Sequence, residues 1–381
     1  MADRTKVLGE ALSPSQLGTL LVAGYATQAL CYFPRPQVTY AGRAALLTEV
    51  AAGLAAALGL WLWIRVAALH PGESPEAALR ALGPAQWPLV IGIAAYHILL
   101  GMNWLMIYTS VLHGIFLEAT PLWALAGAIL AESLYLAWNQ VVPLARALQS
   151  LWVPVAVFTV FSLAGGMALI RHPRLLWPAL PPTARGFALG SLHGLSAYLG
   201  LDAVAWFYPY VHPAARRTAG RHLFWWLAGS FAAFSWALED VMGTFGPDFI
   251  PALRWPMAQF VRLQSLATFY VNKFGLVVLL LWTVTSVSFE AVHITVAAQA
   301  LHPLGGYRTR AGFRWHAAVV ALLIGGVLVG VRSPYRVQHL LGTTTLLTGA
   351  VYTFSLPLLL LGANALAGRR TAAGPRAGEG S

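Results

Sequence analysis

The sequence predicts an all-α integral membrane protein with ten transmembrane helices, and three observations favour this fold class. Hydrophobic residues make up 58% of the 381 residues and only 10% are charged, a balance typical of polytopic membrane proteins. Apolar runs of about 20 residues, each long enough to cross a bilayer, follow one another along the chain. The abundance of Trp, Tyr and Phe, with 15, 13 and 17 copies, suits aromatic belts at two membrane interfaces.

The predicted spans are apolar runs separated by polar or proline-bearing segments. They cover residues 17–33, 44–69, 88–113, 121–140, 147–170, 186–211, 222–245, 266–300, 315–331 and 339–366. We expect residues 1–381 to form a single polytopic membrane domain in contact with the lipid bilayer, with a basic disordered tail at 367–381.

An even number of spans places both chain termini on one side of the membrane. The tightest arginine clusters, at 216–221, 308–314 and 369–376, then lie on that same side. Lys and Arg are enriched in cytoplasmic loops, so both termini are expected in the cytoplasm. The net charge of +11 is explained by such loops and by anionic lipid rather than by nucleic acid, because no basic run alternates with aromatic residues.

A weak internal repeat relates approximately residues 14–171 to residues 185–366, at an offset of about 175 positions. Gly24 in the first span maps one residue from Gly200 in the sixth, and both spans end in an aromatic pair followed by proline. Five helices in each half make the repeat inverted. This predicts that helices one and six are broken at mid-membrane, where freed backbone groups bind a small ligand. Close helix packing at the glycines is the alternative.

Asp202 is the most prominent candidate for function, because an ionised carboxylate at mid-membrane is costly unless it is paired or hydrated. It is expected to bind a cation or a ligand amine or to carry a proton; a neutral acid at a helix break is the alternative. Glu290 and Glu132 follow as candidates for a proton or ion relay. Glu290 lies three residues before His293, which predicts an acid–histidine pair on one helix face. Glu49 is expected to reach towards the interface.

Several functional classes are disfavoured. A single cysteine, Cys31, excludes a disulfide within the chain and a cysteine-rich metal site. His97, His193 and His293 lie on three predicted helices without the spacing of a metal motif. The sequence also has no Walker loop, nucleophile elbow or catalytic triad pattern. We therefore expect no metal, no cofactor and no enzymatic activity.

Three segments carry a family resemblance. They are HPGESPEAALRALGP after the second span, EATPLWAL at the start of the fourth and LSAYLGLDAVAWFYPYVHP in the sixth. In sequence and spacing they resemble the spore germination permeases, the B subunits of nutrient germinant receptors in the amino acid–polyamine–organocation superfamily. The similarity extends over about residues 14–365. It implies a LeuT-like fold with a 5+5 inverted repeat and a ligand pocket between spans one, three, six and eight.

The resemblance also implies a function. It suggests a subunit of the spore inner membrane that senses a small nutrient such as an amino acid, with a membrane A subunit and a lipoprotein C subunit as partners. The expected ligand-binding residues are Gly24, Tyr25, Ala26, Thr27, Tyr96, Leu100, Ser196, Tyr198, Leu199, Gly200, Asp202, Thr285 and Phe289. For Tyr96, Leu100, Thr285 and Phe289, core packing is the alternative.

Two other functions remain open. One is a secondary transporter for amino acids or amines that uses the same site, with proton coupling through Asp202 or Glu290. The fifth span has no Lys or Arg to replace a coupling sodium ion, which favours a sensor over a pump. The other alternative is an intramembrane haem or redox protein based on the histidines.

Overall fold

The computed structural model describes residues 11–29, 31, 33–171, 173–177, 183–264, 274–301, 310–327 and 334–372, and all regular structure within these ranges is helical. The main helices are α1 (Pro14–Tyr25), α3 (Ala45–Ala67), α5 (Gln86–Val111), α6 (Leu122–Trp138), α7 (Val141–Gly166), α8 (Ala184–Leu195), α9 (Ala203–Phe207), α10 (Arg216–Phe245), α12 (Phe274–Leu301), α13 (Arg310–Gly326) and α14 (Pro334–Ala372). Shorter helices are α2 (Arg35–Ala41), α4 (Glu76–Leu79) and α11 (Pro256–Leu263).

Every predicted span overlaps one of these helices, or the pair α8 and α9 in the case of the sixth span. Parts of three predicted spans lie outside the described residues, namely 30 and 32 in the first, 266–273 in the eighth and 328–331 in the ninth. Most of the predicted tail and Arg308 also lie outside them. The all-α fold class is therefore confirmed. The number of helices that cross the membrane stays a prediction.

The surface and the helix lengths agree with a membrane environment. Among the described residues, five helical stretches are long and apolar enough to cross a bilayer: Arg35–Ala67, Glu76–Phe116, Val141–Leu169, Val277–Leu301 and Gly342–Gly368. Large apolar side chains also point outwards, and Trp123 and Leu322 are 73% and 75% exposed. A helix that is apolar on its outer face is stable in lipid rather than in water. The protein is therefore a multi-pass membrane protein.

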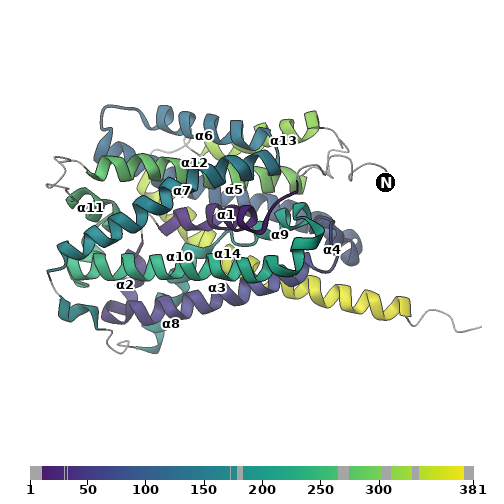
Figure 1. The fold of residues 1–381 in the computed structure, drawn as a ribbon, viewed down its shortest axis with the longest axis horizontal. Helices are drawn as coiled ribbons and strands as arrows, with labels where there is room; N and C mark the ends of the chain where they lie inside the picture. Colours follow the sequence, from purple (N-terminus) through teal and green to yellow (C-terminus); the bar gives the residue numbers. More distant parts are fainter. Residues whose placement is uncertain are drawn as a thin grey trace, which may run out of the picture.

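The helices run roughly parallel, with α1 near the middle, α6 and α13 along one edge, and α3 and α8 along the other (Figure 1). Helix α1 packs against α7, α10 and α12, while α12 also packs against α5 and α6. Every residue from Leu17 to Tyr25 is buried. Since α1 is enclosed on all sides, its interruption and the groups near it face protein rather than lipid.

The start of α1 is tied to the end of the sixth span. Ser13 caps the helix in a capping box with Gln16. Just before it, the Leu12 N–H donates to the Tyr210 carbonyl at 2.8 Å, and the His212 N–H donates to the Leu12 carbonyl at 3.2 Å. Backbone groups left free at these helix ends are thus satisfied by each other. The two helices that carry interruptions are anchored together at one end.

The sixth helical segment is interrupted in its middle. Helix α8 ends at Leu195, a 3₁₀ turn spans Ser196–Tyr198, and Leu199 is extended, with ψ of 133°. Gly200 has φ of +102°, a conformation that residues with a side chain rarely adopt. Helix α9 then begins at Ala203. On the other side, α1 passes at Ala26 into the 3₁₀ turn Ala26–Ala29, which contacts the turn at Ser196–Tyr198.

Candidate functional site

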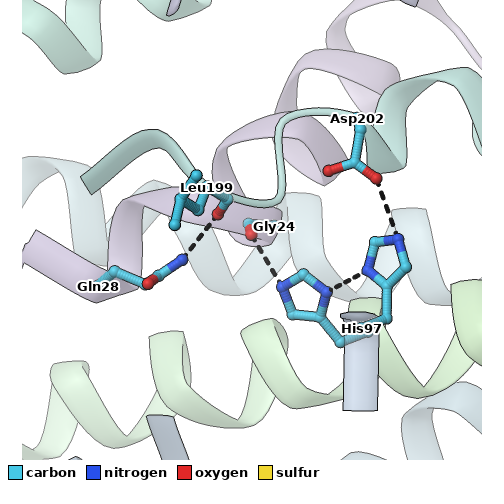
Figure 2. A network of polar contacts seen from close by, with 6 residues as sticks. Gly24, Gln28, His97, Leu199 and Asp202 are labelled. Atoms are coloured by element: carbon cyan, nitrogen blue, oxygen red, sulfur yellow. Dashed lines mark hydrogen bonds and ion pairs between the residues drawn. The ribbon is translucent and has the colours of Figure 1, made fainter. Parts of the chain in front are cut away.

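A chain of buried polar groups joins the two interruptions (Figure 2). On α12, His293 Nε2 donates to the Gly24 carbonyl oxygen at the end of α1, with a separation of 3.0 Å. The Nδ1 atoms of His293 and His97, the latter on α5, lie 2.7 Å apart. His97 Nε2 lies 3.0 Å from Asp202 Oδ2, at the start of α9. All three side chains are completely buried, so the contacts are made without solvent screening. We call this set the Asp202–His97–His293 chain.

Two further hydrogen bonds involve the residues of the interruptions. The Gln28 side-chain amide donates to the Leu199 carbonyl at 2.7 Å (Figure 2). The Thr27 hydroxyl donates to the Thr285 carbonyl on α12 at 3.1 Å. The carbonyls of Gly24 and Leu199, which the helix breaks release from helical bonding, are therefore occupied by side chains of the protein itself.

Aromatic rings surround the two imidazoles. Tyr96 and Tyr352 stack with ring centroids 4.4 Å apart, and the His97 ring stands edge-on to Tyr352 at 6.2 Å. The ring of Phe289 meets that of His293 edge-on at 4.2 Å. The faces of aromatic rings carry negative quadrupole charge, which favours a cation between them.

Eight of the residues predicted from sequence lie in or beside this region: Gly24, Thr27, Tyr96, Leu199, Gly200, Asp202, Thr285 and Phe289. The ring centroids of Tyr25 and Tyr198 lie 5.7 Å apart. Their hydroxyls bond to other residues, because Tyr25 donates to Ser230 and Tyr198 donates to Glu49. Ser196 bonds to the His193 carbonyl within its own turn. Ala26 and Leu100 are buried and contribute apolar surface.

The sequence did not identify His97, His293 and Gln28 as parts of one polar network. The histidines were considered only for metal or haem binding and, for His293, as a partner of Glu290. A usable signal was present: His97 adjoins Tyr96, and His293 lies one turn after Phe289, both candidates for the site. His193 is not part of the network, because it stacks on Tyr40 at 5.0 Å. Within the described ranges, no group of three or more His, Cys, Asp or Glu side chains is placed to hold a metal ion.

The expectation for Glu49 was wrong. Its side chain is completely buried and does not reach the interface. Glu49 accepts hydrogen bonds from the Tyr198 hydroxyl at 2.6 Å and from the Gln37 amide at 3.1 Å. These two donors replace the water that the carboxylate would otherwise seek.

Two other candidate carboxyls, Glu290 and Glu132, lie outside the Asp202–His97–His293 chain. Glu290 is completely buried and its two oxygens have no hydrogen-bond partner among the described residues. It faces Gly101, where an added Cβ would lie 2.7 Å from Glu290 Oε2. Its expected partner, His293, instead contacts Gly24 and His97. Glu132 is exposed on α6, away from the Asp202–His97–His293 chain.

A hollow of about 470 Å³ lies elsewhere, at the junction of α6, α12 and the π-helical turn Leu112–Phe116. Its lining is apolar apart from Thr120 and Thr283. It does not include the residues of the two interruptions. Beside the interruptions, the rings of His97 and Phe289 pack against the ring of His293.

Comparison with solved structures defines the class of protein. The crystal structure of MhsT in complex with L-phenylalanine is similar at a TM-score of 0.56 and 13% sequence identity, covering 90% of this chain and 88% of that chain. At this identity the similarity shows the fold alone. The protein is an integral membrane protein with the LeuT-type transporter fold.

The family follows from sequence. The family profile described as "Spore germination protein" matches residues 11–307, so the chain belongs to the spore germination protein family. A comparison with curated proteins finds no match.

Proposed function

We propose that the protein is the nutrient-binding membrane subunit of a spore germination receptor. It binds a small nutrient such as an amino acid where the interruption of α1 meets the interruption between α8 and α9, and it catalyses no reaction. The observation that carries this proposal is the contact of Gly24 with Gly200, bridged by His293. Family membership and the complex of MhsT with L-phenylalanine support the same class of ligand.

A ligand would act by competing for bonds that the protein now makes with itself. An ammonium group would take the Gly24 carbonyl from His293, and a second donor would take the Leu199 carbonyl from Gln28. Opening these contacts would favour a different arrangement of the helices, which a partner subunit then senses. The proposed partners are a membrane A subunit and a lipoprotein C subunit. The protein is proposed to lie in the spore inner membrane with both chain termini in the cytoplasm.

Binding of amino acids to the purified protein tests the proposal. A nutrient should raise the unfolding temperature of the wild type and have a much smaller effect on Gly200→Leu, whose side chain would occupy the contact with Gly24. Gly127→Leu is the matched control, because a Cβ at Gly127 meets nothing within 4 Å. Equal stabilisation of all three proteins would place the ligand elsewhere.

A proton-coupled amino acid or amine transporter is the second candidate. The observation that favours it is the pair of buried carboxyls, Asp202 and Glu290, in the membrane interior. Vesicles that contain this protein alone distinguish the two functions. A transporter accumulates labelled amino acid when a pH gradient is imposed, and loses that accumulation in Asp202→Asn, whereas a receptor subunit binds the amino acid without accumulating it.

A further inference from the structure

We propose that Asp240 and Thr244, where α10 meets α7 and α11, bind a monovalent alkali-metal cation. The cation balances a buried carboxylate and holds α10 against the end of α7. This site does not rest on the proposed function, because neither residue belongs to the two interruptions.

The carboxyl of Asp240 lies where three helices meet. Helix α10 packs against α7 and α11, and the three come together at one end of the bundle (Figure 1). A Cβ added to Gly166, the last residue of α7, would collide with the Phe260 ring on α11 and would lie 2.8 Å from Asp240 Oδ2. Asp240 is only 1% exposed. Its carboxyl is therefore enclosed by these helices.

Asp240 has no balancing positive charge in the part of the chain that the structure describes. Neither of its oxygens has a hydrogen-bond partner there, and the ion pairs of that part join Arg80 to Glu73 and His97 to Asp202. The indole of Trp236, one turn earlier on α10, lies near the carboxyl, but it is neutral and cannot balance a charge. A buried carboxylate is costly unless a cation accompanies it.

Thr244 supplies a second free oxygen on the same helix face. It follows Asp240 by four residues on α10, and side chains at this spacing are neighbours. Thr244 is 8% exposed, and its hydroxyl also has no hydrogen-bond partner among the described residues. The hydroxyl and the carboxylate are thus not placed to bond directly to each other. A cation between them can contact both oxygens.

The end of α7 also favours a cation. The C-terminal end of a helix carries partial negative charge, which repels a carboxylate and attracts a cation. One turn before Gly166, the Ser162 hydroxyl donates to Gln264 Oε1 at 2.6 Å, and Gln264 Nε2 donates to the Ser162 carbonyl at 2.9 Å. These two residues bond to each other rather than to Asp240.

The available ligands indicate one positive charge. A single carboxylate is balanced by a monovalent cation, whereas Ca²⁺ sites use several carboxylates. Glu239 projects about 100° away from Asp240 around the helix, so it does not join this set. Hard cations bind oxygen ligands, and the absence of a His or Cys metal motif therefore does not bear on this site.

Equilibrium unfolding in mixed micelles tests the site. It compares NaCl, KCl and N-methylglucamine chloride at equal ionic strength. Above the dissociation constant of the bound ion, each tenfold rise in Na⁺ or K⁺ should lower the unfolding constant of the wild type about tenfold relative to N-methylglucamine. Asp240→Asn should lose this dependence. Asp248→Asn, which removes an exposed carboxyl just after α10, is the matched control and should keep it.

Equal unfolding constants in the three salts overturn the proposal, as does an equal ion dependence in the wild type and Asp240→Asn. A response to CaCl2 without a response to NaCl or KCl also overturns it. If Asp240→Asn does not fold, Thr244→Val provides the test, because it keeps the carboxylate and removes one ligand. The ion concentration that gives half of the effect should then rise severalfold, and an unchanged concentration overturns the proposal.

Discussion

Gly24 and Gly200 bring the two helix interruptions together backbone to backbone. A Cβ added to Gly24 would lie 3.2 Å from the Gly200 carbonyl oxygen, and one added to Gly200 would collide with the Gly24 carbonyl. The backbones of the two interruptions therefore lie directly beside each other at these two residues. A side chain at Gly200 would not fit without displacing the Gly24 carbonyl, and one at Gly24 would fit only tightly.

Gly200→Ala should destabilise the protein strongly. Its φ of +102° is strained for alanine by about 1–3 kcal/mol, and the new methyl group would meet the Gly24 carbonyl. Gly127→Ala on α6 should instead be neutral or gain about 0.5–1 kcal/mol. Unfolding in mixed micelles measures both. If the two alanine variants are equally stable, the close contact of the interruptions is wrong.

Tyr198→Phe should cost more stability than Tyr25→Phe, although the two rings contact each other. Tyr198 donates to the buried carboxylate group of Glu49, whereas Tyr25 bonds to the neutral hydroxyl of Ser230. Tyr198→Phe leaves the buried Glu49 Oε1 without its donor at a cost of about 1–3 kcal/mol, whereas loss of an ordinary neutral hydrogen bond at Tyr25 costs about 0.5–1.5 kcal/mol. Thermal unfolding compares the variants, and a double variant with Glu49→Gln should cost less than the sum of the two single changes.

Glu290→Met and Glu49→Met should have opposite effects. Glu290 has no hydrogen-bond partner among the described residues, so an apolar side chain of similar length removes an unsatisfied buried group and should raise stability. Glu49 accepts from Tyr198 and Gln37. Met would leave the buried Tyr198 hydroxyl unpaired at a cost of about 1–3 kcal/mol, while the Gln37 amide keeps Ala45 and Thr48 as partners. The unfolding temperature of each variant, compared with that of the wild type, shows whether the change raises or lowers stability. A loss of stability in Glu290→Met would show that its carboxyl has a stabilising partner.

Arg216→Ala should loosen the segment that follows α9. The guanidinium donates to the carbonyls of Val211 and Pro209, each at 3.1 Å. Losing both bonds should cost about 1–3 kcal/mol, and Arg216→Lys should restore only part, because lysine lacks the planar fork. The exposed neighbour Arg217 is the control, with an expected change within about 0.5 kcal/mol. Faster proteolysis near residue 212 in Arg216→Ala alone would give a second measure.

The sequence was enough to locate the helices and the interruption of the sixth segment. Long apolar runs determine where a helix can cross a membrane, since lipid leaves no other partner for the backbone. The Gly200–Asp202 stretch indicated a break because glycine permits positive φ and a carboxyl is costly in lipid. The structure places Leu199 in an extended conformation and Gly200 at positive φ there.

Only the tertiary structure decided which polar side chains meet. His97 and His293 are 196 positions apart, and Tyr198 and Glu49 are 149 apart, so no local pattern relates them. The pairing of Glu290 with His293 was expected from helical spacing, but the imidazole of His293 contacts the Gly24 carbonyl and His97 instead. Glu49 looked like an interfacial residue because Tyr198 and Gln37 reach it only after folding. Composition and periodicity determine which segments enter the membrane, whereas the partners of buried polar groups depend on how the helices pack.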